Sequence, residues 1–171
     1  MAMSQEQWRP VVGYEGSYEV SDQGRVRSIA RTIHYPKGGL RELPTRVLSQ
    51  RMRGRARSLY PVVELARNNR KHSFKIHVLV LEAFVGPRPN NCVACHANDD
   101  PKDNRLENLR WDTCSANTHD SIINGSHYQA GKTVCRQGHE YSGGNLYFRP
   151  DGGRGCRACR RQASMKHRIS A

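Results

Sequence analysis

The sequence has no long apolar run. No stretch approaches the roughly 18 consecutive apolar residues that a membrane-spanning helix needs. The first residues, Met1 to Gln7, are mostly polar and lack the apolar segment of a secretory signal. These two features argue against a membrane protein and against a secreted one. We therefore expect a soluble, intracellular protein.

Aromatic residues are scarce, and so are acidic ones. Aromatic residues make up 7% of the 171 residues and hydrophobic residues 36%, which favours one modest domain or two or three small modules over a single large core. Lys and Arg number 28 against 15 Asp and Glu, giving a net charge of +13. A basic protein of a membrane surface would need a long amphipathic helix, and the sequence shows none.

The positive charge is concentrated in the two ends of the chain. Residues 1–70 carry 13 Lys/Arg against 6 Asp/Glu, residues 71–129 carry 6 against 7, and residues 130–171 carry 9 against 2. A near-neutral centre between two basic arms is typical of a protein that attracts phosphates at its ends and holds a cation between them.

The near-neutral centre contains one histidine and two asparagines at a distinctive spacing. His96 is followed by Asn108 after 12 positions and by Asn117 after 21. Leu109 and Trp111 alternate with polar residues, as in a short half-buried strand.

Strand and helix signals flank this strand. A first strand is predicted at 92–96. A helix is predicted over 116–124, with Thr113 or Ser115 as its N-cap and Gly125 ending it. The predicted order is strand, loop, strand and helix.

This order, with His, Asn and Asn at this spacing, resembles the HNH nuclease motif, also called the ββα-metal finger. The pieces Cys95-His96-Ala-Asn-Asp-Asp, Asp103-Asn104-Arg105 and Glu107-Asn-Leu-Arg-Trp111 are similar to those of phage and homing-type HNH endonucleases. The resemblance implies hydrolysis of DNA phosphodiester bonds to 5′-phosphate and 3′-hydroxyl ends. It also implies one catalytic divalent cation, Mg²⁺ or Mn²⁺, with Zn²⁺ as a further candidate.

The resemblance also implies roles for three residues. His96 is the general base, because a neutral imidazole with an ordinary pKa of about 6.5 can activate water. Asn117 ligates the metal from the helix, where the ion stabilises the phosphate and the leaving oxygen. Asn108 pins the loop and orients the His96 ring. Each residue alone is more often structural, so these roles depend on the joint spacing.

Cys95 departs from the family pattern, in which the residue before the base is usually a metal-ligating Asp. Thiolate favours softer ions, whereas Mg²⁺ and Mn²⁺ prefer oxygen. Three arrangements are open: Cys95 ligates the metal, Asp99 or Asp100 substitutes for the missing acid, or Asn117 holds the ion with water and phosphate alone. We favour the last, with Cys95 close by.

The N-terminal stretch from Trp8 to Ser28 predicts short strands separated by Gly13, Gly16 and a turn at 21–24. Its pieces resemble the module that often precedes HNH nucleases in phage and intron-encoded endonucleases, which is taken to contact DNA. The resemblance implies DNA contacts from Arg25 and Arg27, and a solvated polar face is the alternative.

A second basic stretch is predicted to form the edge of a hairpin that turns near Gly54. Arginines recur in it at a period of two, and four guanidinium groups on one edge would track a phosphate backbone. An ordinary surface charge run is the alternative. These arginines are Arg51, Arg53, Arg55 and Arg57.

The six cysteines are expected to be metal ligands or free thiols, because intracellular proteins rarely keep disulfides. Cys135 and His139 are followed by Cys156 and Cys159, and three thiolates with one imidazole are what a structural zinc ion prefers. Cys92 and Cys95 also form a Cys-x-x-Cys pair, but without a second pair at a convincing distance.

Between the two ligand pairs, the sequence predicts a hairpin turning at Asp151 and Gly152, and after them a basic helix. The arrangement resembles a treble-clef-like finger, too small to fold without one structural Zn²⁺. Unligated cysteines and redox chemistry are the alternatives. The finger would grip DNA phosphates through Arg157, Arg160 and Arg161.

We therefore expect an α+β protein with three parts. These are a β-rich DNA-binding module at 1–72, an HNH nuclease at 73–128 whose ββα-metal core spans about 91–125, and a zinc-binding finger with a basic C-terminal helix at 129–171. The expected function is a metal-dependent HNH endodeoxyribonuclease that nicks duplex DNA as a monomer or cuts both strands as a homodimer. Intron homing and phage packaging are both open as its role. It would act in the cytoplasm, of a bacterial host if a phage encodes it.

We expect double-stranded DNA as the partner, and neither a membrane nor a small-molecule substrate. One alternative is a non-catalytic, zinc-containing DNA-binding protein on a degenerate HNH scaffold, since Cys95 replaces an acid. Another is an RNA-binding or RNA-cutting protein. The scarcity of aromatic residues for stacking bases argues against it.

Overall fold

The computed structural model describes residues 5–34, 38–55, 59–150 and 152–169. The chain divides into two compact units, residues 1–124 and residues 125–171. The mixture of helices and strands confirms the predicted α+β class. The predicted boundary at 72/73 lies within a strand of the first unit, and the predicted boundary at 128/129 lies shortly after that unit ends.

Short antiparallel strands form most of the N-terminal half of the first unit, as expected of alternating apolar and polar residues between turns. They make a four-stranded sheet in the order β1-β2-β3-β6, a three-stranded sheet in the order β7-β8-β9 and a β4–β5 hairpin. The bounds are β1 (Trp8–Pro10), β2 (Tyr18–Ser21), β3 (Val26–Ser28), β4 (Arg31–His34), β5 (Leu40–Leu43), β6 (Arg46–Val47), β7 (Arg51–Arg53), β8 (Tyr60–Arg67) and β9 (Arg70–Lys75).

Two asparagines form the turn between β8 and β9. Asn68 and Asn69 have φ values of 51° and 59°, a left-handed conformation that asparagine tolerates better than most residues. Arg67 pairs with Arg70 across the turn. The hairpin delivers the chain to helix α1 (Ile76–Phe84).

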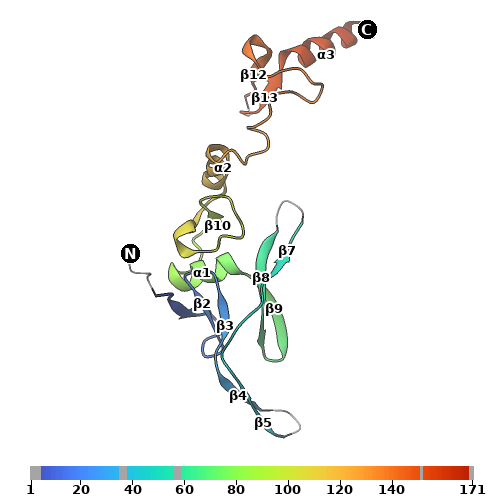
Figure 1. Ribbon diagram of the computed structural model, residues 1–171. Helices are drawn as coiled ribbons and strands as arrows, with labels where there is room; N and C mark the ends of the chain where they lie inside the picture. The colour runs from blue at the N-terminus through green and yellow to red at the C-terminus, as the bar shows by residue number, and fades with distance from the viewer. Residues whose placement is uncertain (1–4, 35–37, 56–58, 151, 170–171) are drawn as a thin grey trace. The chain divides into compact units, whose positions relative to one another are not determined.

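Helix α1 lies in the middle of the first unit (Figure 1) and packs against β1, β2, β8 and β9 as well as β10 (Cys92–His96) and β11 (Leu109–Thr113). Since α1 contacts both sets of strands, the N-terminal strands and the predicted nuclease share one hydrophobic core. Each Val, Leu or Ile side chain buried in it stabilises the fold by about 1.5–3 kcal/mol. The buried members of this core are Val11, Tyr18, Val20, Val26, Val63, Leu65, Ile76, Leu79, Val80, Leu81 and Leu109.

The predicted strand, loop, strand and helix are present at the end of the first unit. A one-turn 3-10 helix, η1 (Leu106–Asn108), precedes β11, and α2 (Cys114–Ile123) follows it. Thr113 caps α2 by accepting a hydrogen bond from the Ala116 amide at 3.1 Å. The helix thus begins two residues before the predicted start at Ala116.

The second unit contains a 3-10 turn, a hairpin and a helix. They are η2 (Gly143–Asn145), β12 (Leu146–Phe148), β13 (Arg154–Cys156) and α3 (Arg157–Ile169). The Arg149 amide donates to the Gly153 carbonyl at 2.7 Å and closes the predicted hairpin turn, in which Asp151 lies outside the described residues. Within the described ranges, no helix is long and apolar enough to cross a membrane.

Candidate functional site

His96 ends β10, where it pairs with Leu109 of β11. Successive side chains of a strand point to opposite faces, so Ala94 and His96 share one face while Cys95 lies on the other. His96 thereby faces a cavity of about 120 Å³. The residues that line the cavity are Leu59, Tyr60, Ala94, His96, Asp99, Pro101 and Asn117.

This cavity brings together residues that the sequence singled out separately. It contains the predicted base His96, the predicted metal ligand Asn117 and the alternative ligand Asp99. Asp99 is kept at its place by Asn124 at the C-terminal end of α2, whose amide donates to the Asp99 carboxylate at 3.1 Å and to the Ala97 carbonyl at 2.8 Å. Residues that carry an imidazole, an amide and a carboxylate therefore line one small cavity.

The His96 ring is held by Asn104, which was not among the predicted site residues. His96 Nε2 lies 3.2 Å from Asn104 Oδ1, and both side chains are buried. Because the Asn104 amide nitrogen donates to the Lys102 carbonyl at 3.3 Å, its oxygen faces the ring and accepts the proton of Nε2. Nδ1 then carries the lone pair. Burial lowers the pKa of His96 more than Asn104 and the nearby aspartates raise it, which favours the neutral base.

Two further rings contact His96. The ring centroids of His77 and His96 are 5.0 Å apart in an edge-to-face arrangement, and the Tyr60 ring lies 5.0 Å from His77 and 6.3 Å from His96. His77 is buried. Burial, and then the neighbouring His96 and Lys75, lowers the pKa of His77 to about 3. No sequence signal pointed to Tyr60.

Asn108 acts on the loop rather than on the ring. Its side chain accepts from the Asn98 amide at 3.1 Å and donates to the Asn98 side chain at 2.9 Å and to the Asp103 carbonyl at 2.8 Å. These contacts pin the loop between β10 and β11. They leave the orientation of the His96 ring to Asn104.

Cys95 is not among the residues that line the cavity. It is 1% exposed, and burial raises the pKa of its thiol, with Arg110, Asp112 and Asp120 as charged neighbours. Asp100 is committed to a turn, where its carboxylate accepts from the Lys102 amide at 2.9 Å. Of the alternative ligands, Asp99 is the one that shares the cavity with His96.

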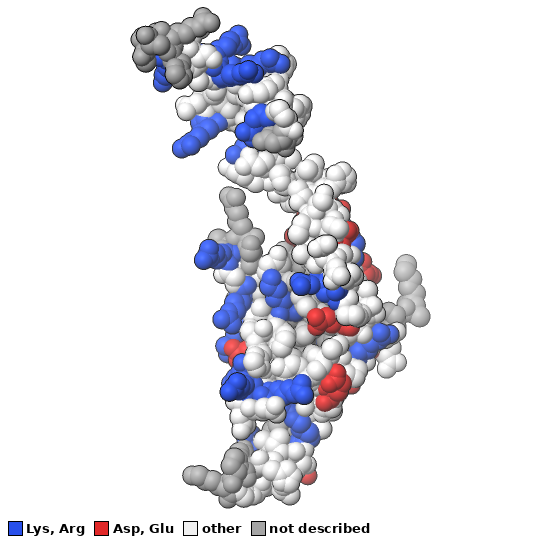
Figure 2. Space-filling view, turned by 180° about the vertical axis from the view of Figure 1, so that it is seen from behind, with Lys and Arg blue, Asp and Glu red and all other residues white. Residues whose placement is uncertain are grey.

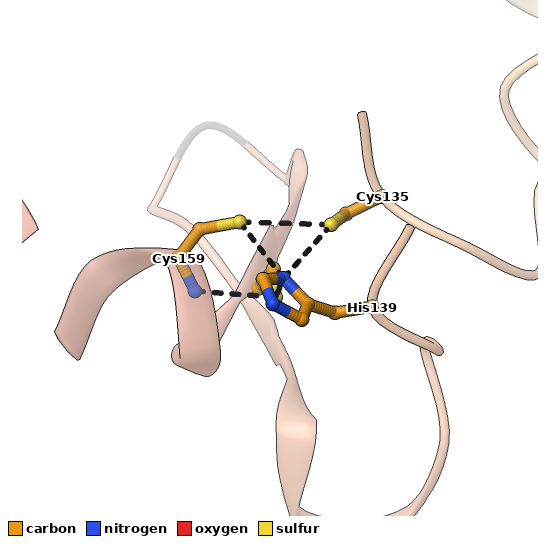
Figure 3. A group of neighbouring side chains, drawn as sticks. Cys135, His139 and Cys159 are labelled. Atoms are coloured by element: carbon orange, nitrogen blue, oxygen red, sulfur yellow. Dashed lines mark hydrogen bonds between the residues drawn. The ribbon is translucent and has the colours of Figure 1, made fainter. Parts of the chain in front are cut away.

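In the second unit, the four predicted zinc ligands converge, and Figure 3 shows three of them, Cys135, His139 and Cys159, pointing toward one another. The donor atoms of Cys135, His139, Cys156 and Cys159 all lie within 4.8 Å of one another. Cys135 Sγ is 3.6 Å from Cys159 Sγ and 3.4 Å from His139 Nδ1. Sulfur ligands at about 2.3 Å in a tetrahedron would be about 3.8 Å apart. The donor set and its spacing therefore fit a tetrahedral metal ion.

The thiols of this cluster differ in pKa, and without a cation they do not all ionise together. The Cys159 backbone amide donates to Cys156 Sγ at 3.5 Å and lowers the pKa of Cys156 to about 6. Burial, followed by the thiols of Cys135 and Cys156, raises the pKa of Cys159 to about 11. A cation among the sulfur atoms would offset the repulsion between the negative charges, so that all three cysteines could bind it as thiolates.

The predicted DNA contacts Arg25 and Arg27 are held by acidic partners. Arg25 pairs with Glu6, with an Nε–Oε1 distance of 2.8 Å, and Arg27 pairs with Glu19 at 2.7 Å. The Arg27 guanidinium also lies 4.1 Å from the centroid of the Trp8 ring. These partners offset much of the charge that the sequence assigned to DNA.

The second arginine stretch is only partly a strand. Arg51 and Arg53 share one face of β7 and, with Arg46, line a cavity of about 530 Å³. Gly54, with a φ of 142°, follows the strand, so Arg55 lies beyond it and the predicted period of two does not continue. Arg57 lies outside the described residues.

Helix α3 carries the basic surface of the second unit. Arg157, Arg160 and Arg161 are exposed and line a cavity of about 750 Å³ with Ser164. The guanidinium groups of Arg157 and Arg160 each lie 5.6 Å from the Tyr147 ring centroid. Figure 2 shows many Lys and Arg side chains on the visible face of each unit.

Two protein-family models match the chain. Residues 6–65 match the NUMOD4 motif and residues 74–119 match HNH endonuclease. They cover the N-terminal strands and the stretch from β9 to Asn117 and His119, and they end before the four-ligand cluster of the second unit.

Two curated proteins are similar to the chain. DNA endonuclease I-HmuI of Bacillus phage SP01 is 30% identical over 125 residues, which are 70% of this chain and 60% of the relative. The uncharacterized HNH endonuclease L247 of Acanthamoeba polyphaga mimivirus is 33% identical over 128 residues, 72% of this chain and 28% of the relative. The chain thus spans less than two thirds of either relative.

A solved structure is similar as well. It is described as DNA binding and cleavage by the HNH homing endonuclease I-HmuI. It matches with a TM-score of 0.55 and 26% sequence identity, covering 70% of this chain and 60% of that chain.

Proposed function

We propose that the chain is a metal-dependent endonuclease of double-stranded DNA. The premise is that it carries a NUMOD4 motif followed by an HNH endonuclease domain and is homologous to the homing endonuclease I-HmuI. We propose that it leaves 5′-phosphate and 3′-hydroxyl ends and nicks one strand per monomer. It would act in the cytoplasm, of a bacterial host if a phage encodes it. The observation that carries the proposal is the shared cavity of His96, Asp99 and Asn117.

His96 is the general base of the proposed reaction. Its Nε2 proton is held by Asn104, so Nδ1 is the atom that takes a proton from water. The hydroxide attacks the phosphorus atom, the bond from phosphorus to the 3′ oxygen breaks, and that oxygen takes up a proton from solvent. The lowered pKa of His96 keeps Nδ1 free of a proton near neutral pH.

Asn117 and Asp99 would hold the catalytic cation. Their amide and carboxylate oxygens suit Mg²⁺ or Mn²⁺ better than a soft ion, and the protonated Cys95 on the opposite face of β10 does not favour Zn²⁺ here. A bound divalent cation supplies charge stabilisation on the phosphate and the leaving oxygen. This assignment gives Asp99 the role of the acid that Cys95 replaces.

A plasmid assay tests catalysis. Supercoiled plasmid is incubated with Mg²⁺, Mn²⁺ or EDTA and with wild type, His96→Ala or the exposed-histidine control His34→Ala. We expect nicking by wild type and His34→Ala with metal, and a loss of about 10² to 10⁴-fold in His96→Ala. DNA ligase should reseal the nicks, because it needs a 5′-phosphate beside a 3′-hydroxyl. A wild-type protein that binds the plasmid but does not cut it, whichever metal is added, would instead support the non-catalytic DNA-binding protein.

The ligand assignment has its own measurement. Mn²⁺ binding, followed by electron paramagnetic resonance with a non-cleavable DNA duplex, should weaken in Asp99→Asn and stay near wild type in Cys95→Ser and Asp100→Asn. The opposite ranking of Asp99→Asn and Cys95→Ser would give the ligand role to the thiol.

We also propose that Cys135, His139, Cys156 and Cys159 bind one structural Zn²⁺ and that the second unit adds phosphate contacts through Arg157, Arg160 and Arg161. The zinc proposal is supported by the close spacing of the four donor atoms, and the phosphate contacts are supported by the exposed arginines along α3. Element analysis should find one zinc per chain in wild type, His96→Ala and the exposed-cysteine control Cys114→Ser. Cys135→Ser should lose it. Zinc that remains in Cys135→Ser would refute the site.

A further inference from the structure

The turn between β2 and β3 of the NUMOD4 motif packs directly on the loop of the nuclease site. The Leu106 amide donates to the Asp22 carbonyl at 2.8 Å. The Cα of Gly24 faces Asn104 so closely that a Cβ atom built at Gly24 would lie 2.7 Å from the Asn104 Cβ and 2.9 Å from its carbonyl oxygen. Backbone atoms of the two segments are thus in contact, although 80 residues of chain separate them.

The turn is itself held firmly. The Gly24 amide donates to the Ser21 carbonyl at 3.1 Å, and the Ser21 hydroxyl, which is fully buried, accepts from the Arg25 amide at 3.0 Å. The side chain of Gln50 donates to the Gly24 carbonyl at 2.9 Å. Gly24 has a φ of 74°, a conformation that glycine adopts without the strain that a side chain brings.

On the other side of the contact, Asn104 is 4% exposed, and its Oδ1 is the partner of His96 Nε2 at 3.2 Å. A backbone shift of the 104 loop would move this oxygen with it. Since Oδ1 sets which nitrogen of the ring carries the proton, a shift would also change which nitrogen can act as base.

We infer that the turn at 21–25 positions the general base, with Gly24 and Asn104 as positioning residues that act through His96. The inference rests on the proposed role of His96 and goes beyond it, because it makes a part of the NUMOD4 motif a structural component of the cleavage site. Gly24 is required for a reason other than turn formation: its missing side chain lets the two segments touch.

The chain offers a matched control. Gly16 has a φ of 71°, close to that of Gly24, and a Cβ built there meets no atom of the described part of the chain within 4 Å. Gly16→Ala and Gly24→Ala therefore both place a side chain at a similar positive φ, and only Gly24→Ala adds an atom against Asn104. A difference between the two variants isolates the contact with the site.

Two measurements distinguish a loss of His96 positioning from a general loss of folded structure. We expect Gly24→Ala to lower kcat for plasmid nicking by about tenfold or more, as misplaced catalytic groups do, with KM for DNA within about twofold of wild type. Gly16→Ala should keep both values. Nitrogen-15 NMR of the histidine side chains should show His96 protonated on Nε2 in wild type and Gly16→Ala, and a mixture of the two forms in Gly24→Ala. The NMR readout does not need activity, so it tests the inference even if the proposed function fails.

A double-mutant cycle tests the route through Asn104. Asn104→Ala alone should lower kcat and release the His96 proton from Nε2, and adding Gly24→Ala to it should lower kcat no further. Independent, multiplying losses would overturn the inference. So would a Gly24→Ala protein with the kcat and the His96 proton position of wild type.

Gln50→Ala serves if Gly24→Ala does not fold. It removes the hydrogen bond to the Gly24 carbonyl without adding an atom. A several-fold loss of kcat with a shifted His96 signal would support the inference, and a His96 signal identical to wild type would overturn it.

Discussion

His77 makes the stability of the first unit depend on pH. The residue is 3% exposed and packs between Tyr60 and His96, and its Nδ1 has no hydrogen-bond partner among the residues that the structure describes. The burial of the ring, followed by the charges of His96 and Lys75, lowers the pKa of His77 to about 3. The folded protein therefore keeps His77 neutral at a pH where the unfolded chain protonates it.

The sign and size of the effect follow from these two pKa values. In the unfolded chain His77 titrates near its ordinary value of about 6.5. Between about pH 6.5 and 3, only the unfolded state binds this proton, so the free energy of unfolding falls as the pH falls, by about 1.4 kcal/mol per pH unit. From pH 6.5 to pH 4 the free energy of unfolding falls by about 3 kcal/mol, which is a large part of the roughly 5–15 kcal/mol by which native proteins are typically stable.

His77→Phe removes the titration and keeps a ring of similar shape. Urea unfolding at pH 7 and pH 4, followed by tryptophan fluorescence, reports the first unit alone, because both tryptophans, Trp8 and Trp111, belong to it. We expect wild type to lose about 3 kcal/mol more than His77→Phe between the two pH values. His34→Phe, at an exposed histidine, should behave like wild type.

At pH 7, His77→Phe should be as stable as wild type or more stable, because it replaces a buried nitrogen without a partner. Equal losses of stability on acidification in wild type and His77→Phe would show that His77 is protonated in the folded state, and the reasoning from its burial would be wrong.

Three further predictions concern the core, the loop and the second unit. Leu65→Ala, at a fully buried position, should lower the free energy of unfolding by about 2–5 kcal/mol in urea; a loss below 1 kcal/mol would contradict its place in the core. Asn108→Ala removes three hydrogen bonds of the site loop and should speed amide hydrogen exchange at Asn98, and unchanged exchange would show that other contacts hold the loop. Arg160→Gln should reduce the slope of log K for DNA against log salt by about 0.9 if the guanidinium contacts one phosphate, and an unchanged slope would remove Arg160 from the DNA surface.

Local chemistry explains what could be predicted from the sequence. The order of strand, loop, strand and helix at 92–123 depends on alternation, a threonine cap and a glycine stop, all of which act over a few residues. The convergence of Cys135, His139, Cys156 and Cys159 was also predictable, because paired Cys and His residues at short spacing are typical of a structural metal site. The NUMOD4 and HNH resemblances fall in the same class, since they consist of short runs of residues.

Charge was harder to assign from the sequence. The arginines at 25 and 27 have an obvious period of two, but Glu6 and Glu19 reach them only because β2 and β3 pair and the N-terminal segment lies beside them. A residue's charge is visible in the sequence, whereas the partner that offsets it is chosen by the fold.

The sequence by itself determined the HNH pattern, the residues His96, Asn108 and Asn117, and the four-ligand cluster, because each is encoded by residues close together or by a ligand set with fixed spacing. Only the tertiary structure decided that Asp99 rather than Cys95 shares the cavity with His96, that Asn104 holds the ring, and that Gly24 and His77 lie against the site. Gly24 lies 80 residues from Asn104 in the sequence, and it and His77 reach the site only because α1 brings the N-terminal strands and the β10–β11 hairpin into one core. Asp99 and Asn104 lie within eight residues of His96, but the folded conformation of the β10–β11 loop selects which of its side chains reach the ring and the cavity.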